Sequence, residues 1–302
     1  MDTIIKRIEQ LKKEKDIAIL AHYYTDSRIQ ILADCVGDSY FLSKTATEIP
    51  QKTILFCGVT FMGESAKLLS PEKTILMPDS TADCPMAHMA DIDEIRAVRE
   101  KYEDVAVVCY VNSTAEIKAH SDVCVTSANA LKVVKKLPNK NIYFIPDANL
   151  GRYIAGMIPE KCFILGDGFC HVHTSIKKEN IQKAKELYPE ALILAHPECT
   201  QDVLEIADYI GSTSGIIDYA GKSNAKVFII CTEMGILHEL EAKNPDKTFY
   251  SVGHRQFCPH MKRITVEQVL EQLENADNLV TLDEEMMGNA NKALEKMMVM
   301  SK

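Results

Sequence analysis

Three cysteines occupy equivalent places in three similar stretches of this chain. They are Cys84, Cys170 and Cys258, in the strings DCPM, FCHVH and FCPHM. A cysteine thiolate is a soft ligand that suits zinc or an iron–sulfur cluster better than a hard metal ion. The sequence around them has neither the short CxxC pairs of structural zinc sites nor the close cysteine spacing of ferredoxins. If these cysteines bind one metal centre, the fold must bring them together.

Each cysteine ends one copy of a repeated unit of roughly 85 residues. The first apolar run of each copy ends at His22, Tyr110 or His196. An aspartate follows twelve residues later in every copy, at Asp34, Asp122 and Asp208. A hydroxyl side chain follows seventeen residues later, at Ser39, Ser127 and Thr213. Self-similarity of this kind predicts one small domain used three times and a pseudo-threefold molecule.

Within each unit, helical segments alternate with four short apolar runs. Lead helices are predicted at 2–15, 91–103 and 177–188 from apolar residues at helical spacing,. The runs are IAILAH, ADCVG, TILFCGV and TILMPD in the first copy, and ALILAH, ADYIG, KVFIICT and TFYSVG in the third. Such unalternating runs are typical of parallel strands that are buried on both faces. The predicted fold class is therefore α/β, with three similar three-layer α/β/α domains whose parallel sheets are related by pseudo-threefold symmetry around a central active site.

The predicted domains are residues 1–86, 87–172 and 173–261. After Cys258, the segment ITVEQVLEQLENADNLVTL resembles the lead helix and first strand of another copy. We expect residues 262–302 to pack on the first domain and to close the ring. The final helix carries a methionine stripe, which is typical of a packing face.

The matched positions follow strands in every unit. His22, Ser39 and FMGE do so in the first copy, Tyr110, Ser127 and PDANLG in the second, and His196, Thr213 and TEMG in the third. Open parallel sheets bind ligands at the carboxyl ends of their strands. Three units around one axis would therefore place these residues and the three cysteines on a single cavity. A [4Fe-4S] cluster on three thiolates leaves one iron without a protein ligand, and such a Lewis acid suits hydration, dehydration or condensation.

The composition is that of an ordinary globular protein. The chain has 302 residues, of which 46% are hydrophobic and 25% charged, and its formal net charge is -9. The negative charge and the lack of a basic stripe argue against nucleic acid as a partner. Neither a signal peptide nor an apolar stretch of membrane-spanning length is evident, so no membrane association is expected. Ten cysteines in such a chain indicate free thiols in a reducing cytoplasm,.

The repeated hydroxyl residues have two interpretations. Ser39, Ser127 and Thr213 lie in turns that can bind phosphate or carboxylate through backbone N–H groups and hydroxyls. Each could instead be the N-cap of the helix that follows it. Their common register in the repeat leaves the two interpretations about equal.

The other cysteines and histidines also leave alternatives open. Cys57, Cys109 and Cys231 lie in or at the end of apolar strands and are most simply buried apolar residues,. Cys199 in HPEC competes with the three repeated cysteines as a ligand, and His171 with His173 could also ligate a metal. Internal symmetry favours Cys84, Cys170 and Cys258.

The chain resembles the quinolinate synthase family of NAD biosynthesis over nearly its whole length. The strings that carry the resemblance are AHYY, GDS, CPMAH, YVNST, TSAN, PDANLG, HPEC, GST and CTEMG. The resemblance implies a triangular three-domain fold and one [4Fe-4S] cluster per chain on Cys84, Cys170 and Cys258. It also implies condensation of iminoaspartate with dihydroxyacetone phosphate to quinolinate, phosphate and water, with functional coupling to L-aspartate oxidase.

Matched motif by motif, the resemblance also implies the site residues. They are His22, Tyr24, Ser39, Tyr110, Asn112, Ser127, His173, His196, Glu198, Ser212 and Thr213. Glu198 is the candidate base, because forming the aromatic ring requires proton transfers at several carbons. Tyr24 and Tyr110 would orient substrate and share a proton, the three histidines would bind carboxylate or phosphate, and the hydroxyls would add donors. The predicted catalytic residues are Glu198, Tyr24, Tyr110 and His196.

Two other functions fit a cluster held by three domains. One is a diphthamide-type radical enzyme, which would need S-adenosylmethionine and a protein partner; HPEC, YVNST and GST argue against it. The other is a non-enzymatic iron–sulfur sensor, which predicts no substrate cavity and no turnover.

Overall fold

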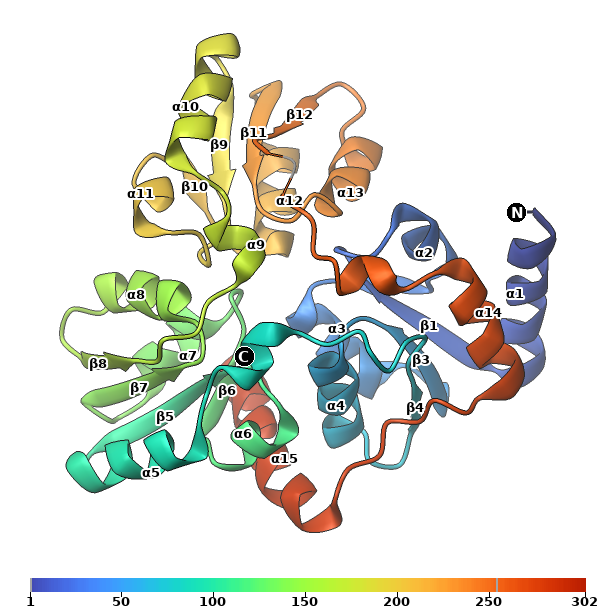
Figure 1. Cartoon of the computed structure of the whole chain (residues 1–302), viewed down its shortest axis with the longest axis horizontal. Helices are drawn as coiled ribbons and strands as arrows, with labels where there is room; N and C mark the ends of the chain where they lie inside the picture. Colours follow the sequence, from blue (N-terminus) through green and yellow to red (C-terminus); the bar gives the residue numbers. More distant parts are fainter. Residues whose placement is uncertain (1, 254) are drawn as a thin grey trace.

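Three similar units surround a common centre in the computed structural model, which describes residues 2–253 and 255–302 (Figure 1). Each unit is a four-stranded parallel sheet with helices on its faces. The strand orders are β2-β1-β3-β4, β6-β5-β7-β8 and β10-β9-β11-β12, so the first strand of every unit lies inside its sheet. The predicted fold class of three α/β/α domains is confirmed.

The strands match the short apolar runs closely. The first sheet has β1 (Ile17–His22), β2 (Cys35–Gly37), β3 (Thr53–Cys57) and β4 (Thr74–Leu76). The second has β5 (Val105–Tyr110), β6 (Val123–Val125), β7 (Asn141–Ile145) and β8 (Cys162–Leu165). The third has β9 (Leu192–Ala195), β10 (Tyr209–Ile210), β11 (Val227–Cys231) and β12 (Thr248–Ser251). Every residue of β1 and β5 is buried, as expected of inner parallel strands,.

The helices repeat in the same order from unit to unit. The lead helices are α1 (Asp2–Lys15), α5 (Ile92–Lys101) and α10 (Lys178–Leu187). After the first strands come α2 (Ser27–Leu32), α6 (Ala115–Ala119) and α11 (Gln201–Leu204), and after the second strands α3 (Ser39–Glu48), α7 (Ala130–Lys136) and α12 (Thr213–Lys222). After the third strands come α4 (Thr60–Leu69), α8 (Ala148–Met157) and α13 (Ile236–Lys243). The short helix α9 (His171–Thr174) follows Cys170, and the chain ends with α14 (Val266–Asn275) and α15 (Glu284–Met300).

The repeated aspartate ties the first two strands of each unit together. Asp34 Oδ2 accepts a hydrogen bond of 2.8 Å from the N–H of Ile19. The equivalent bonds are 2.7 Å from Val107 to Asp122 and 2.7 Å from Ile193 to Asp208. In each unit the aspartate N–H also donates back to the carbonyl of the same strand residue. This repeated position therefore has a structural role that leaves the carboxyl ends of the strands free for chemistry.

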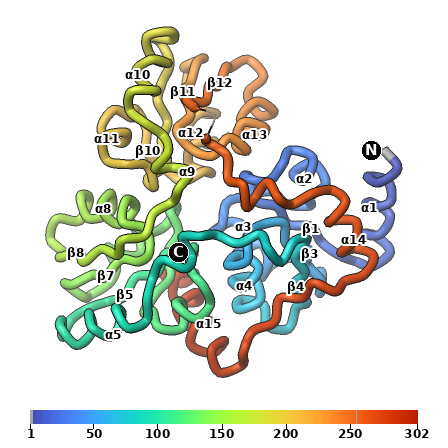
Figure 2. Tube along the Cα trace, viewed as in Figure 1, coloured from blue at the N-terminus to red at the C-terminus, as the bar shows by residue number. Residues whose placement is uncertain are grey.

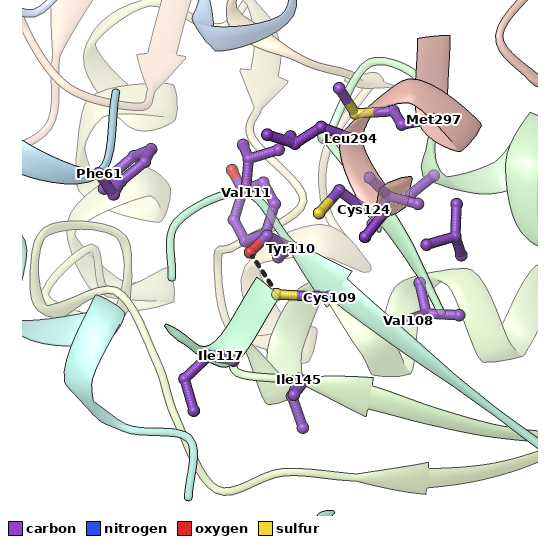
Figure 3. Close-up of a cluster of buried hydrophobic side chains, with 14 of the residues drawn as sticks. Phe61, Val108, Cys109, Tyr110, Val111, Ile117, Cys124, Ile145, Leu294 and Met297 are labelled. Atoms are coloured by element: carbon purple, nitrogen blue, oxygen red, sulfur yellow. Dashed lines mark hydrogen bonds between the residues drawn. The ribbon is translucent and has the colours of Figure 1, made fainter. Parts of the chain in front are cut away.

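Three of the remaining cysteines are buried apolar side chains, as predicted. Cys57, Cys109 and Cys231 have no exposed surface. Figure 3 shows Cys109 and Cys124 in the core of the second unit, and Leu294 and Met297 of α15 belong to the same cluster of buried side chains. The Cys109 thiol donates to the carbonyl oxygen of Tyr110 at 3.3 Å. Met297 thus belongs to a packing face of the final helix.

The C-terminal segment covers two units rather than one. Helix α14 packs on α1 of the first unit, as expected, but α15 packs mainly on α6 and β6 of the second unit and reaches α4 of the first. Figure 2 follows this path from one unit to the next. The expectation that residues 262–302 pack on the first domain is thus wrong for α15. The reason is that an apolar helix face does not indicate which sheet or helix it will cover.

The strand expected after α14 does not form as in the other copies. Leu279 makes a single antiparallel bridge to Leu76 at the outer edge of the first sheet. The N–H of Val280 donates to the carbonyl of Ile75 at 2.9 Å. Both sides of β1 and β3 are already paired, so a further segment can add only at an edge strand, and this one meets β4. Among the described residues, no helix combines the length and the apolar character needed to cross a membrane.

Candidate functional site

A cavity at the centre of the molecule is lined by residues from all three units. The first unit provides His22, Tyr24, Asp38, Ser39, Tyr40, Val59, Phe61, Cys84 and Met86. The second provides Tyr110, Asn112, Thr126, Ser127, Cys170 and Val172, and the third His173, His196, Glu198, Thr213, Glu233, Cys258 and Met261. Within the described part of the chain, Ser212 is the one predicted site residue that is not on this wall.

A repeated backbone hydrogen bond positions the three cysteine loops. In the first unit, the N–H of Thr60 donates to the carbonyl of Ala82 at 2.8 Å. The equivalent bonds are Ala148 to Gly168 at 2.8 Å and Met234 to Gln256 at 2.7 Å. Each acceptor lies two residues before a cysteine, and each donor lies just after a third strand. The same bond therefore fixes every cysteine against the carboxyl end of its sheet.

A carboxylate also holds the backbone N–H of each cysteine. The N–H of Cys84 donates to Asp83 Oδ1 at 2.7 Å. The N–H of Cys170 donates to Asp147 Oδ2 at 3.2 Å, and that of Cys258 to Glu233 Oε1 at 3.0 Å. Asp147 and Glu233 are both fully buried. Both side chains lie in strings that follow strands, PDANLG and TEMG, but their residue types alone did not mark them as site residues.

The surroundings raise the pKa of all three thiols. Burial, followed by the charge of Cys258, raises the pKa of Cys84 to about 12. Burial also raises the pKa of Cys170, with the Glu198 charge adding to the shift, and burial raises the pKa of Cys258. Thiols that line one cavity become thiolates when a cationic centre binds them. This donor set of three soft sulfurs on one cavity fits a [4Fe-4S] cluster.

The competing cysteine lies elsewhere. Cys199 is fully buried in an apolar cluster of the third unit with Cys231 and Val203. Its thiol donates to the carbonyl of Cys231 at 3.3 Å. Its side chain therefore serves packing and is not among the residues that line the cavity.

A buried histidine and glutamate lie directly beside one of these cysteines. His173 Nδ1 is 2.7 Å from Glu198 Oε2 and 3.1 Å from the sulfur of Cys170. Their ligand atoms lie within 4.8 Å of one another, so this group alone could bind a metal ion. His171 is different, because its side chain is exposed and its ring lies 6.1 Å from that of His260. Of the two histidines after Cys170, His173 is the one on the cavity.

Glu198 is ionised in this setting. Burial raises its pKa, but the neighbouring imidazoles of His173 and His196 and hydrogen bonds from His173 and Tyr110 outweigh burial and lower the pKa to about 2. A carboxylate held by such donors at neutral pH is ready to accept a proton. Tyr110 is the opposite case, because burial and then the Glu198 charge raise the pKa of its phenol well above the ordinary value. Tyr110 therefore donates rather than accepts.

His22 and His196 are neutral hydrogen-bond donors toward the cavity. His22 Nδ1 accepts the N–H of Tyr24 at 3.1 Å, and His196 Nδ1 accepts the N–H of Glu198 at 3.3 Å. Burial, and then the charge of Lys262, lowers the pKa of His22 to about 3. Burial likewise lowers the pKa of His196 to about 3. With Nδ1 occupied as an acceptor, the proton of each neutral ring is on Nε2.

Tyr24 belongs to a buried hydroxyl network that sequence reasoning missed. Its phenol oxygen lies 2.8 Å from Thr213 Oγ1 and 2.9 Å from Thr232 Oγ1. Thr232 is also 2.8 Å from Nε2 of His173, so it links the tyrosine to the histidine. The signal was the string CTEMG, in which Thr232 is the first polar residue after β11. Tyr23, the neighbour of Tyr24, packs instead in an apolar cluster of the third unit.

The helix caps decide between the two interpretations of the repeated hydroxyls. The N-cap of α3 is Asp38, and the N-cap of α12 is Ser212. Ser39 and Thr213 are thus first helical residues that line the cavity, and the N-cap interpretation is wrong for both. Ser212 does cap α12, because its hydroxyl accepts the N–H of Gly215 at 3.2 Å.

Comparison with known proteins gives a consistent result. A family model described as quinolinate synthetase A protein matches residues 6–299. A quinolinate synthase of Clostridioides difficile is 50% identical over 291 residues, which are 96% of each chain. One of Fusobacterium nucleatum is 51% identical over 97% of each chain. A quinolinate synthase 2 of Methanosarcina acetivorans is 46% identical over 99% of this chain and 96% of its own.

Proposed function

The chain belongs to the quinolinate synthase A family of enzymes, and from this premise we propose that it condenses iminoaspartate with dihydroxyacetone phosphate to give quinolinate, phosphate and water. One observation carries the proposal. The cavity combines three thiols, one from each unit, with the His173–Glu198 pair and a set of neutral hydrogen-bond donors. Such a site can bind a metal cluster, hold anionic substrates and transfer protons.

Cys84, Cys170 and Cys258 would hold a single [4Fe-4S] cluster in this site. When bound, such a cluster has one iron without a protein ligand, and that iron supplies Lewis acidity toward a substrate oxygen. The carboxylates of Asp83, Asp147 and Glu233 accept the cysteine N–H groups and so fix the loops that bear the thiols. The ligand loops are therefore already ordered by bonds that do not involve the metal.

Proton transfer is assigned to Glu198 and its neighbours. The ionised carboxylate can accept a proton from a substrate carbon, and His173, whose Nδ1 is 2.7 Å away, donates to that carboxylate and holds it in place,. Tyr110 donates a hydrogen bond to the same carboxylate. Tyr24 is placed by Thr213 and Thr232 to orient substrate.

Anion binding is assigned to neutral donors. No lysine or arginine of the described residues is on the cavity wall, so carboxylate and phosphate groups would be bound by histidine N–H, amide and hydroxyl donors. His22 and His196 present Nε2–H, while Asn112, Ser39, Ser127 and Thr213 add side-chain donors,.

The two alternative functions are not favoured. The family match extends over residues 6–299 and is to quinolinate synthases rather than to radical enzymes. A sensor has no need of the His173–Glu198 pair and of hydroxyls converging on the cavity. A cytoplasmic location and supply of iminoaspartate by an L-aspartate oxidase are part of the proposal, since this imine hydrolyses in water.

Anaerobic purification with iron and sulfide analysis, followed by an assay for quinolinate, tests the proposal. We expect about four irons and four sulfides per chain, turnover in the wild type, and loss of both in Cys84→Ala. The matched variant Glu198→Gln should keep the cluster and lose turnover. A chain that binds the cluster and forms no quinolinate from the two substrates would refute the proposed reaction, and one that binds no cluster would refute the ligand assignment.

A further inference from the structure

Position by position, the repeat aligns three polar residues that precede the cavity hydroxyls. They are Asp38, Thr126 and Ser212. Asp38 caps α3 by accepting the N–H of Phe41 at 2.9 Å, and Ser212 caps α12 by accepting the N–H of Gly215 at 3.2 Å. In the first and third units, this side chain is therefore used to start a helix.

The second unit starts its helix differently. Helix α7 begins at Ala130 and its N-cap is Asn129, three residues beyond the position of the caps in the other units. Asn129 Oδ1 accepts the N–H of Thr126 at 2.7 Å, and its amide donates to Ser301 Oγ at 2.9 Å. The Thr126 carbonyl accepts the N–H of Ala130 at 2.9 Å. The backbone of this turn is thus fixed at both ends without the Thr126 hydroxyl.

The Thr126 hydroxyl is consequently free. Its residue is 3% exposed, and within the described part of the chain its oxygen has no hydrogen-bond partner. Thr126 nevertheless lies on the wall of the central cavity, next in sequence to Ser127. A buried hydroxyl without a partner lowers stability, so its presence here calls for a partner that binds in the cavity.

We propose that the Thr126 hydroxyl is a further substrate-binding donor, which with Ser127 binds an oxyanion group of a substrate, and that Asn129 and Ser301 position it. The inference rests on the proposed function, whose substrates carry two kinds of oxyanion: the phosphate of dihydroxyacetone phosphate and the carboxylates that persist in quinolinate. A hydroxyl held in a buried turn donates to such an oxygen with little loss of side-chain freedom.

Thr126→Val and Thr126→Ser test the inference in the holoenzyme. Valine keeps the shape and removes the hydroxyl, whereas serine keeps the hydroxyl. Calorimetry with dihydroxyacetone phosphate and with quinolinate measures the Kd for each oxyanion separately. We expect Thr126→Val to raise one Kd by about tenfold or more. For Thr126→Ser, we expect both Kd values to stay within about twofold of the wild-type values. A change for dihydroxyacetone phosphate alone assigns the hydroxyl to phosphate, and a change for quinolinate alone assigns it to a carboxylate.

A stability measurement separates binding from a structural role. Removing a hydroxyl that has no partner should leave the Tm of Thr126→Val unchanged or raised. The control is Thr25→Val, at a fully buried threonine whose hydroxyl donates to the His22 carbonyl at 2.8 Å, and this variant should lower the Tm. Two unchanged Kd values, or a Tm that falls as in Thr25→Val, would overturn the inference. A wild type that forms no quinolinate would instead refute the proposed function.

Discussion

The cysteine loop of the first unit and those of the other two units reach the same place by different contacts. All three share the backbone bond from the third residue after the third strand to the carbonyl two residues before the cysteine. At the second position after that strand, however, the first unit has Val59, where the others have Asp147 and Glu233. The Cys84 N–H is held by its own neighbour, Asp83, instead. The shared backbone frame is what places a cysteine, and the buried carboxylate is an addition to it.

The addition changes the polarity beside each cysteine loop. Val59 lies on the cavity wall with Phe61 and Met86, so the first unit is apolar at this position, whereas Glu233 of the third unit lies on the wall. Burial raises the pKa of Glu233, but Lys262, whose ammonium lies 3.4 Å away, counters the shift. Burial and then the Glu198 charge raise the pKa of Asp147. The three loops are thus equivalent in backbone and different in the side chain at this position.

The largest effect expected is from removing any one repeated cysteine. Cys84→Ala, Cys170→Ala and Cys258→Ala should each abolish cluster binding and turnover. The reason is that each unit would provide one of the three proposed ligands, although the carboxylates that hold the three cysteine loops differ. Iron and sulfide analysis after anaerobic purification measures this. Cys199→Ala is the matched control and should retain the cluster. Retention of a full cluster by any of the three variants would show that the units are not equivalent as ligand donors.

Placing a carboxylate in the first unit should be nearly as damaging. Val59→Asp puts a carboxylate at the N-cap of α4, where a helix N–H can meet it, but the Cys84 N–H is already accepted by Asp83. Because this buried charge has fewer partners than Asp147 and replaces an apolar side chain, it should lower the free energy of unfolding by about 3 kcal/mol. Urea denaturation of the apoprotein measures it, with Val59→Thr as the uncharged control. Equal stability of the aspartate and threonine variants would contradict this explanation.

Removing the carboxylate of the second unit should have a moderate effect. Asp147 caps α8 by accepting the N–H of Leu150 at 2.7 Å and also holds Cys170. Asp147→Ala should therefore cost about 1–3 kcal/mol of stability and speed iron loss to a chelator. Asp147→Asn keeps one oxygen for the cap, so its stability and its rate of iron loss should lie between those of the alanine variant and the wild type. An alanine variant with wild-type stability and iron retention would show that Asp147 is not needed for the loop.

The smallest effects are expected where the units are alike. Asp34→Ala, Asp122→Ala and Asp208→Ala each remove the same bond between the first two strands. Each should cost about 1 kcal/mol in thermal or urea unfolding and leave the KM for both substrates unchanged. A changed KM in any of them would mean that the repeated aspartate acts at the site as well as in the sheet.

The periodic parts of the fold could be predicted from the sequence. The apolar runs became strands, and the repeat placed the strand ends and the three cysteines on one cavity. The packing of α15 on the second unit could not be predicted, because the methionine stripe specifies a buried face but not its partner. Local patterns indicate elements, whereas contacts between distant segments depend on shapes that one sequence does not reveal.

The site residues could be predicted where they occupy repeated positions. They could not be predicted where a single hydrogen bond decides whether a residue caps a helix or lines the cavity. Ser212 and Thr213 are adjacent hydroxyl residues, yet one caps α12 and the other lines the cavity. A shift of one residue in the start of a helix exchanges these roles. Thr232, Asp147 and Glu233 were overlooked for a related reason, since their importance lies in burial and partners rather than in residue type.

Mössbauer spectroscopy of the iron-57 holoenzyme, with and without quinolinate, tests the central claim most directly. The claim is that one cysteine from each unit binds a single four-iron cluster and leaves one iron open to the cavity. We expect one iron of the cluster to change its isomer shift when quinolinate is added, while the other three stay as they were. Four irons that respond alike, or that do not respond to a ligand shown to bind, would contradict the claim.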